Sequence, residues 1–189
     1  MTMNASDISG VAKNLKAVVF DGDGVLFTGS VFMDAGGERL KERSFADGQG
    51  ISMLRAAGIM VAFVSAEATG FLEAVGDKFN NLPSVKSGQW PEVGVFVGAI
   101  GQEKTETVGT WLKTRGIDWS ECAYMGDDMG DYEILKKAGL SAAPAQAEEI
   151  IKKICLFVAR RRGGDGAIRD LVNFILDAKG VDVRTLNLR

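Results

Sequence analysis

Two aspartates, two residues apart, are the most chemically suggestive feature of the sequence. Asp21 and Asp23 follow the short apolar run 17–20 in the stretch AVVFDGDGV. Carboxylates aimed into one pocket repel each other, by roughly 4 kcal/mol per pair at about 4 Å and an effective dielectric constant near 20, so a cation must lie among them. Carboxylate and carbonyl oxygens suit Mg²⁺, which also engages the phosphate oxygens of substrates. The stretch therefore predicts an Mg²⁺ site.

The chain of 189 residues contains no histidine. Nucleophile systems built on Ser-His-Asp or Cys-His are therefore excluded, and so are zinc sites that need imidazole. If the protein is an enzyme, its acid and base groups are carboxylates, lysine or tyrosine.

Apolar runs alternate with helix-length segments along the chain. The runs of strand length are 17–20, 59–64, 93–97, 122–125 and 155–158, and the helix-length segments are 49–57, 68–79, 104–115, 131–137 and 168–178. This alternation predicts an α/β fold, a three-layer Rossmann-like parallel sheet with helices on both faces. Such sheets bind ligands beyond the carboxyl ends of their strands. Asp21, Ser65 and the Gly126-Asp127-Asp128 segment each follow a strand, so we expect them to converge on one crevice.

The segment 25–46 interrupts the alternation. It reads as two short β arms around the turn 34–37, a hairpin that covers the pocket or pairs with another subunit. The expected organisation is one domain over 15–180, preceded by a flexible N-terminus over 1–14 and followed by a C-terminal tail over 181–189.

Composition excludes several classes of partner. The net charge of −3 gives no support for binding to nucleic acid or to an anionic membrane surface. The longest uncharged apolar stretch, around 56–66, is too short to span a bilayer, and the N-terminus lacks the apolar segment of a signal peptide. Cys122 and Cys155 have no metal-type spacing and are expected to be reduced core thiols. We therefore expect a soluble cytoplasmic protein.

Four motifs in order resemble those of the haloacid dehalogenase superfamily of phosphohydrolases. They are Asp21-Gly-Asp-Gly-Val25 after a strand, Ser65 after a second strand, Lys104 at a helix start, and Gly126-Asp-Asp-Met-Gly-Asp131 after a further strand. The resemblance runs from about residue 16 to residue 179, nearly the whole chain. One Asp-x-Asp motif is weak evidence, whereas four ordered parts at strand ends and helix starts are specific.

The resemblance implies a role for each acidic residue. Asp21 would attack phosphorus and become a phosphoaspartate, which divides one difficult hydrolysis into two displacements. Asp23 would protonate the leaving alcohol and then activate water. The Asp21 and Asp127 side chains, with the backbone carbonyl of Asp23, would hold Mg²⁺. Asp128 and Asp131 would orient Lys104 or metal-bound water.

The same resemblance implies a phosphate pocket. Ser65 and the backbone amide of Ala66 would bind phosphate oxygens, while Lys104 would offset the charge of the nucleophile and the phosphoryl group. Ser65 is followed by Ala66 and Glu67, whereas the family usually has Gly after its Thr or Ser, so this part of the resemblance is the less specific one.

The short hairpin in place of a cap domain is similar to the capless branch of the family. That branch includes phosphatases of 3-deoxy-manno-octulosonate 8-phosphate and of 2-keto-3-deoxynononate 9-phosphate, typically tetramers in which a neighbour's hairpin completes the pocket. The resemblance thus implies a phosphorylated sugar acid as substrate and a homotetramer. Ala46, where the octulosonate type has Arg, together with Glu67 and Lys78, favours the nononate type. Arg162 and Arg169, in an Arg- and Gly-rich tail motif, are candidates for the substrate carboxylate.

Other interpretations stay open for single motifs. Asp21 and Asp23 could form a solvated turn, and Asp127 and Asp128 could cap a helix. Glu67 could likewise be a helix cap. Lys78 and the basic tail motif could simply be solvated surface. The segment 98–105 nearly imitates a phosphate-binding P-loop, but Glu103 stands where glycine is required. A phosphoacceptor receiver domain also has acidic residues, Ser or Thr, and Lys on an α/β sheet, but its phosphorylated Asp follows a later strand than its acidic pair. The order of the motifs in this chain therefore disfavours a receiver domain. The main functional alternative is a catalytically weak domain with an assembly or regulatory role, as at the C-terminus of some CMP-sialic acid synthetases.

Overall fold

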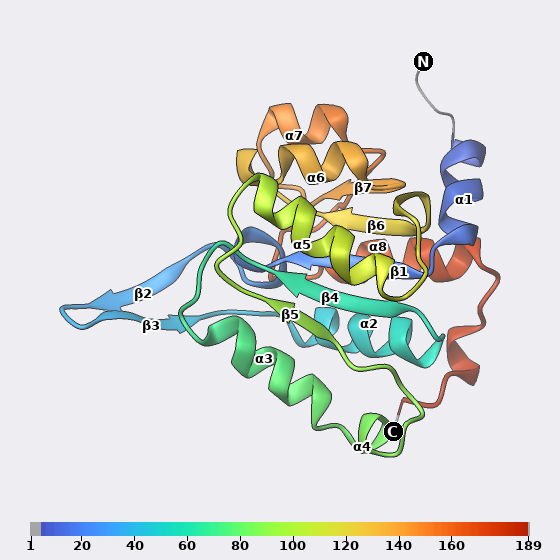
Figure 1. The fold of residues 1–189 in the computed structure, drawn as a ribbon, viewed down its shortest axis with the longest axis horizontal. Coiled ribbons are helices and arrows are strands. Elements are labelled where there is room, and N and C mark those ends of the chain that lie inside the picture. The colour runs from blue at the N-terminus through green and yellow to red at the C-terminus, as the bar shows by residue number, and fades with distance from the viewer. Residues whose placement is uncertain (1–4, 189) are drawn as a thin grey trace.

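The computed structural model describes residues 5–188 and contains one central sheet of six parallel strands (Figure 1). The order across the sheet is β5-β4-β1-β6-β7-β8. The strands are β1 (Ala17–Asp21), β4 (Met60–Val64), β5 (Gly94–Phe96), β6 (Cys122–Met125), β7 (Leu140–Ala143) and β8 (Phe157–Val158). β1 is buried along its whole length, because helices cover both faces of the sheet. The predicted fold class is confirmed.

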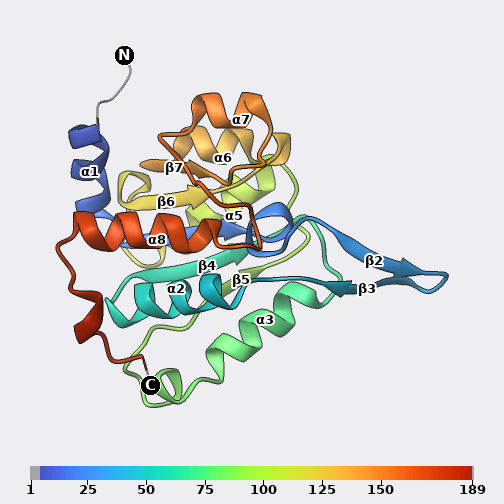
Figure 2. The same ribbon diagram turned by 180° about the vertical axis from the view of Figure 1, so that it is seen from behind.

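Two apolar cores lie on opposite faces of the sheet. Figure 2 shows α2 and α8 across one face, where they pack with α1 and α3, and Figure 1 shows α5 across the other, on the side of α6 and α7. The helices are α1 (Ala5–Asn14), α2 (Phe45–Ala56), α3 (Phe71–Asn80), α4 (Pro83–Lys86), α5 (Gln102–Lys113), α6 (Tyr132–Lys137), α7 (Glu149–Ile154) and α8 (Ala167–Ala178).

Helix α8 shows why these segments fold as they do. Its buried residues recur at three- and four-residue spacing, Ile168, Leu171, Val172, Ile175 and Leu176, which gives the helix one apolar stripe against the core. Each such side chain contributes about 1.5–3 kcal/mol when it is fully buried. Its N-terminus is held by Asp47 of α2, whose carboxylate oxygens accept hydrogen bonds from the backbone of Gly166 and Arg169, each at 2.9 Å.

The segment after β1 forms the predicted hairpin, which projects from the body of the molecule (Figures 1 and 2). Its antiparallel strands are β2 (Val31–Asp34) and β3 (Gly37–Lys41). Asp34 Oδ1 accepts a hydrogen bond from the Gly36 backbone at 2.7 Å, and Gly37 has a φ of 105°, so the turn falls at 34–37. No cap domain is inserted anywhere in residues 5–188.

Several elements were not predicted from the sequence. Strand β7 has the sequence LSAA, whose small residues lack the β-branched and aromatic types that mark a strand, although it is buried between β6 and β8. The short helices α4 and α7 were also missed. Residues 5–14 of the expected flexible N-terminus form α1, while residues 1–4 lie outside the described part of the chain.

Within residues 5–188, no helix has both the length and the apolar character needed to cross a membrane.

Candidate active site

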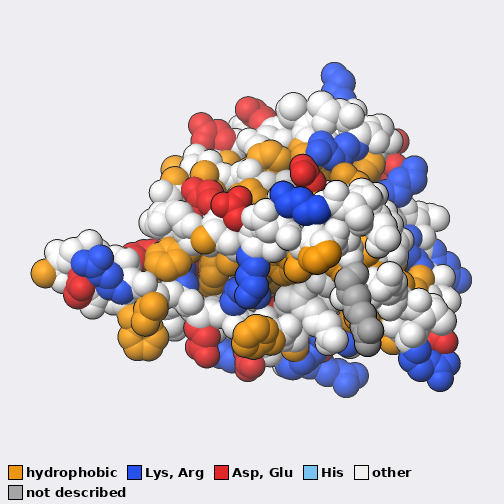
Figure 3. All heavy atoms as spheres, turned by 90° about the horizontal axis from the view of Figure 1, so that it is seen from below, with side chains coloured by type: hydrophobic (Ala, Val, Ile, Leu, Met, Phe, Trp, Pro, Cys, Tyr) orange, Lys and Arg blue, Asp and Glu red, His pale blue; other side chains and the backbone are white. Residues whose placement is uncertain are grey.

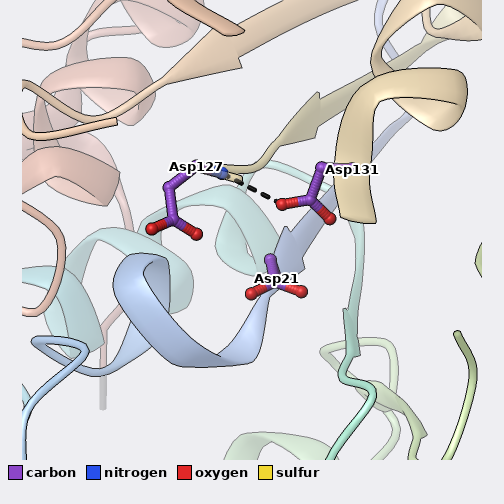
Figure 4. Close-up of side chains that lie close together, drawn as sticks. All are labelled: Asp21, Asp127 and Asp131. Carbon is purple, nitrogen blue, oxygen red and sulfur yellow. Dashed lines mark hydrogen bonds between the residues drawn. The ribbon is translucent and has the colours of Figure 1, made fainter. Parts of the chain in front are cut away.

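Parallel pairing brings the acidic motifs together at one edge of the sheet. Asp21 ends β1, and Asp127 comes two residues after the end of the neighbouring strand β6. Figure 4 shows the Asp21, Asp127 and Asp131 carboxylates facing one another, and one oxygen from each lies within 4.8 Å of the others. Three carboxylate oxygens at this spacing fit a divalent cation.

Lys104, in the first turn of α5, places an ammonium group in the acidic cluster. Its Nζ lies 2.5 Å from Asp21 Oδ1 and 2.9 Å from Asp131 Oδ1, and the side chain is buried. Asp131 is further held by the Tyr124 hydroxyl, which donates to Oδ1 at 2.6 Å, and by the Asp127 backbone, which donates to Oδ2 at 3.0 Å. Both carboxylate oxygens of Asp131 therefore accept hydrogen bonds from protein groups and help to hold those groups in place. Tyr124 was not predicted, because inside a strand it reads as an ordinary core residue.

The cluster carries more negative than positive charge. Burial, and next the Asp131 charge, raise the pKa of Asp21 well above its usual value. Burial, followed by the charges of Asp131 and Asp128, raises the pKa of Asp127 to about 7. Burial lowers the pKa of Lys104, but Asp21 and Asp131 raise it further, so the net shift is upward and the ammonium stays charged. The remaining negative charge is what a divalent cation would neutralise.

Gly24 gives Asp127 its place in the cluster. The turn at 22–26 has a φ of 80° at Gly24, and a Cβ there would lie only 2.0 Å from Asp127 Oδ2. Gln146 links this turn to the loop at 163, since its Nε2 donates to the Gly24 carbonyl at 2.6 Å while its Oε1 accepts from the Gly163 backbone at 2.8 Å. Gln146 was not among the site residues predicted from the sequence.

We expect Gly24→Ala to weaken divalent-cation binding by tenfold or more, because its Cβ would displace the Asp127 carboxylate from the acidic cluster. Gly58→Ala is the matched control, since Gly58 has a φ of 78° and an added methyl group there would have nothing within 4 Å. Both variants should lose about 1 kcal/mol of stability through the left-handed conformation. Isothermal titration calorimetry on the two variants checks this, and equal cation affinities would contradict it.

Asp23 pairs with a lysine that sequence reasoning did not single out. Lys41 Nζ, at the end of β3, donates to Asp23 Oδ1 at 2.8 Å and to Oδ2 at 2.9 Å. Burial lowers the pKa of Lys41, but hydrogen bonds and charge from Asp23 and then Glu38 raise it above its ordinary value, so Lys41 is charged at neutral pH. The two partners are 18 residues apart, on either side of the projecting hairpin, and no local pattern marks such a contact.

The predicted phosphate-binding residues lie at the end of β4. Ser65 is buried, its backbone donates to the Phe96 carbonyl at 2.9 Å, and its Oγ accepts from the Glu67 backbone at 3.0 Å. A Cβ on Gly22 would lie 3.0 Å from the Ser65 Cβ, so Ser65 adjoins the turn that follows Asp21. Ala66 and Glu67 are exposed next to it.

The remaining predicted residues have other contacts. Asp128 caps the turn 129–131, where its Oδ1 accepts from the Gly130 backbone at 2.8 Å. The exposed Lys78 lies with its Nζ 5.8 Å from the centre of the Phe45 ring, beside a hollow of about 300 Å³. The Arg169 guanidinium donates to Gln49 at 2.8 Å and to Asn173 at 2.9 Å.

Arg162 is exposed in a loop that packs on the turn after Asp21. The Gly164 backbone donates to the Val25 carbonyl at 2.8 Å, and a Cβ on Gly163 would overlap the Gly24 carbonyl. This packing brings the Arg- and Gly-rich tail motif next to the aspartate-bearing turn.

A parallel α/β sheet whose central strand ends in a lysine-bridged acidic cluster is compatible with a metal-dependent hydrolase. The chain belongs to the haloacid dehalogenase-like hydrolase family, because residues 53–170 match the sequence profile of that family. A 3-deoxy-D-manno-octulosonate 8-phosphate phosphatase from Haemophilus influenzae is 32% identical over 169 residues, which cover 89% of this chain and 86% of that protein. The predicted family and the predicted phosphatase activity are confirmed.

Solved structures agree with this assignment. The 3-deoxy-D-manno-octulosonate 8-phosphate phosphatase from Yersinia pestis superposes with a TM-score of 0.85 at 27% identity, over 98% of this chain and 93% of that one. The cobalt-bound deoxy-D-mannose-octulosonate 8-phosphate phosphatase from Haemophilus influenzae gives a TM-score of 0.77 at 32% identity, over 90% and 92%. The acidic cluster and the metal bound in this neighbour confirm the predicted divalent-cation cofactor.

We expect divalent-cation affinity to fall at least about fivefold from pH 7 to pH 6, and less from pH 8 to pH 7, because a cation in this cluster competes with the proton of Asp127, whose pKa is about 7. Without the cation, folded Asp127 holds its proton between about pH 4 and 7 while the unfolded chain has lost it. Its contribution to stability therefore falls as pH rises through that window. Calorimetric titration with Mg²⁺ at pH 6, 7 and 8 checks this, and a pH-independent affinity would refute it.

Proposed function

We propose that this protein hydrolyses the phosphate monoester of a 2-keto-3-deoxy sugar acid with Mg²⁺ as cofactor, through an aspartyl-phosphate on Asp21. The observation that carries the proposal is the buried Asp21 carboxylate, paired with Lys104 at 2.5 Å and facing Asp127 across the acidic cluster. A nucleophile held this way is fixed in position and shielded from bulk water.

The side chains of Asp21 and Asp127 and the backbone carbonyl of Asp23 are our candidates for holding the ion. Asp131 is better suited to support, since both its oxygens already accept hydrogen bonds from protein groups. When bound, Mg²⁺ supplies charge neutralisation for the phosphate oxygens.

The chain's own residues account for the remaining steps. Asp21 attacks phosphorus, and the bond to the alcohol oxygen breaks as Asp23 gives that oxygen a proton. Asp23 then takes a proton from the water that cleaves the aspartyl-phosphate. Ser65 and the Ala66 amide donate hydrogen bonds to phosphate oxygens, and Lys104 offsets their charge.

We favour the nine-carbon nononate 9-phosphate as substrate. Ala46 stands where octulosonate phosphatases usually carry Arg, and Glu67 and Lys78 match the nononate type, with Arg162 and Arg169 as candidates for the carboxylate. The eight-carbon ester is the second candidate, because the named relatives are octulosonate 8-phosphate phosphatases. Values of kcat/KM for the two esters, measured side by side, test the choice. A tenfold preference for the eight-carbon ester, about 1.4 kcal/mol, would overturn it.

The proposal includes a cytoplasmic homotetramer. Phe32, Met33 and Leu40 on the hairpin are 67%, 66% and 64% exposed, and Figure 3 shows hydrophobic side chains along this projection. Apolar groups on a projecting hairpin suit burial against further copies of the chain. The two free thiols would stay reduced in the cytoplasm. Light scattering should give a tetramer that Phe32→Asp dissociates and Ile150→Asp, on α7, leaves intact; a monomeric wild type would refute the assembly.

A further inference from the structure

The hairpin contributes a cation to the site through Lys41. The Lys41 side chain is only 4% exposed, although lysine is almost always solvated, and its Nζ contacts both carboxylate oxygens of Asp23. The rings of Phe27 and Phe71 flank it, with centres 5.9 and 5.5 Å from Nζ, and Glu38 lies 3.3 Å away. An ammonium group that is largely shielded from water, flanked by two aromatic rings and hydrogen-bonded to both oxygens of one carboxylate has a fixed position.

We propose that Lys41 is a positioning residue, which fixes the carboxyl group of Asp23 in the orientation in which its protonated form can give the leaving alcohol a proton. This inference rests on the proposed function, in which Asp23 is the acid and base.

Asp23 needs such a support because its own segment provides little. It lies between Gly22 and Gly24 in a turn whose φ and ψ of −82° and 132° at Asp23 are not helical, and its side chain is 35% exposed. A carboxylate in that setting rotates about two side-chain bonds. Contacts from one ammonium to both oxygens stop this rotation, and correct orientation is a large part of catalytic proton transfer.

The base of the hairpin determines where Lys41 lies. Lys41 is the last residue of β3 and pairs with Val31 of β2, and the Thr28 backbone donates to the Glu42 carbonyl at 3.0 Å just beyond it. The hairpin therefore acts on the chemistry of its own chain, besides any contact that its outer end makes.

Two esters with different leaving groups test this. β-Glycerophosphate releases an alkoxide that must be protonated, whereas p-nitrophenyl phosphate releases a stable phenolate that needs no proton. The ratio kcat/KM depends only on the steps up to and including the departure of the alcohol. The later hydrolysis of the aspartyl-phosphate therefore does not affect the comparison. Lys41→Met should lower kcat/KM for β-glycerophosphate on the order of 10²-fold, the scale of general acid catalysis, and that for p-nitrophenyl phosphate far less.

Two further variants distinguish a positioning role of Lys41 from a general loss of structure. Lys41→Arg, which keeps the charge, should give a β-glycerophosphate value between those of wild type and Lys41→Met, and it decides the matter if the Met variant does not fold. In an Asp23→Asn background, Lys41→Met should have no further effect. Lys16→Met is the matched control, because Lys16 also pairs with a carboxylate, Glu121 at 2.6 Å, at the opposite end of β1.

Each failure has its own signature. Equal losses on both esters, no loss on either, or an Arg variant as poor as the Met variant would overturn the role of Lys41 while leaving the phosphatase function intact. A wild-type protein without Mg²⁺-dependent release of phosphate from either ester would instead overturn the proposed function, and the Lys41 inference with it.

Discussion

Asp21→Asn should lower kcat/KM for phosphate monoesters by on the order of 10⁴-fold or more, the scale seen when a catalytic nucleophile is removed. A neutral amide cannot attack phosphorus to form the proposed aspartyl-phosphate. Stability should respond differently, because Asp21 is a buried carboxylate whose pKa is raised, first by burial and next by the Asp131 charge. Removing its charge relieves repulsion, so the thermal midpoint should stay the same or rise. Steady-state kinetics and thermal unfolding of the same preparations measure both effects.

Asp77→Asn is the control for this prediction, because Asp77 is an exposed carboxylate on α3. It should leave both activity and thermal midpoint unchanged. Retained activity in Asp21→Asn would rule out Asp21 as the nucleophile. A wild-type protein inactive on a broad panel of phosphate esters would favour an assembly or regulatory role instead.

The sequence predicts the parts of the site that depend on strand ends. Asp21, Ser65 and Asp127 each follow an apolar run, and parallel pairing of β4, β1 and β6 necessarily brings such positions to one edge of the sheet. Lys104 could be predicted only through the family resemblance, since its contact with Asp21 spans 83 residues of chain.

The contacts that orient those residues could not be predicted. Lys41 reaches Asp23 only because of the register of the hairpin, and a lysine on a β arm reads as solvated. Asp47 likewise reads as a polar helix residue, yet it is fully buried and caps α8 from a neighbouring helix. These roles depend on how elements far apart in sequence pack, and hydrophobic periodicity carries no information about that packing.

The Lys104→Met variant should lose about 3–5 kcal/mol of folding stability at pH 8 without divalent cations, the usual cost of removing one partner of a buried ion pair. Lys104 Nζ lies between Asp21 Oδ1 at 2.5 Å and Asp131 Oδ1 at 2.9 Å, so its removal leaves two buried carboxylates facing each other. The loss should be smaller at pH 5, because Asp21, whose pKa is raised, takes up a proton there more readily than an ordinary carboxylate and then no longer repels Asp131. Urea unfolding at the two pH values measures it.

A second substitution tests whether charge, rather than lost packing, causes that loss. Asp131→Asn added to Lys104→Met should recover part of the stability at pH 8, since it removes one of the two facing charges. Lys113→Met, at the exposed end of the same helix, should change stability little. If the double variant is less stable than Lys104→Met at both pH values, the hydrogen bonds that Asp131 receives from Tyr124 and Asp127 outweigh the repulsion. The cluster would then be held together mainly by those neutral donors, and the demand for a cation at this edge of the sheet would be weaker than its charge suggests.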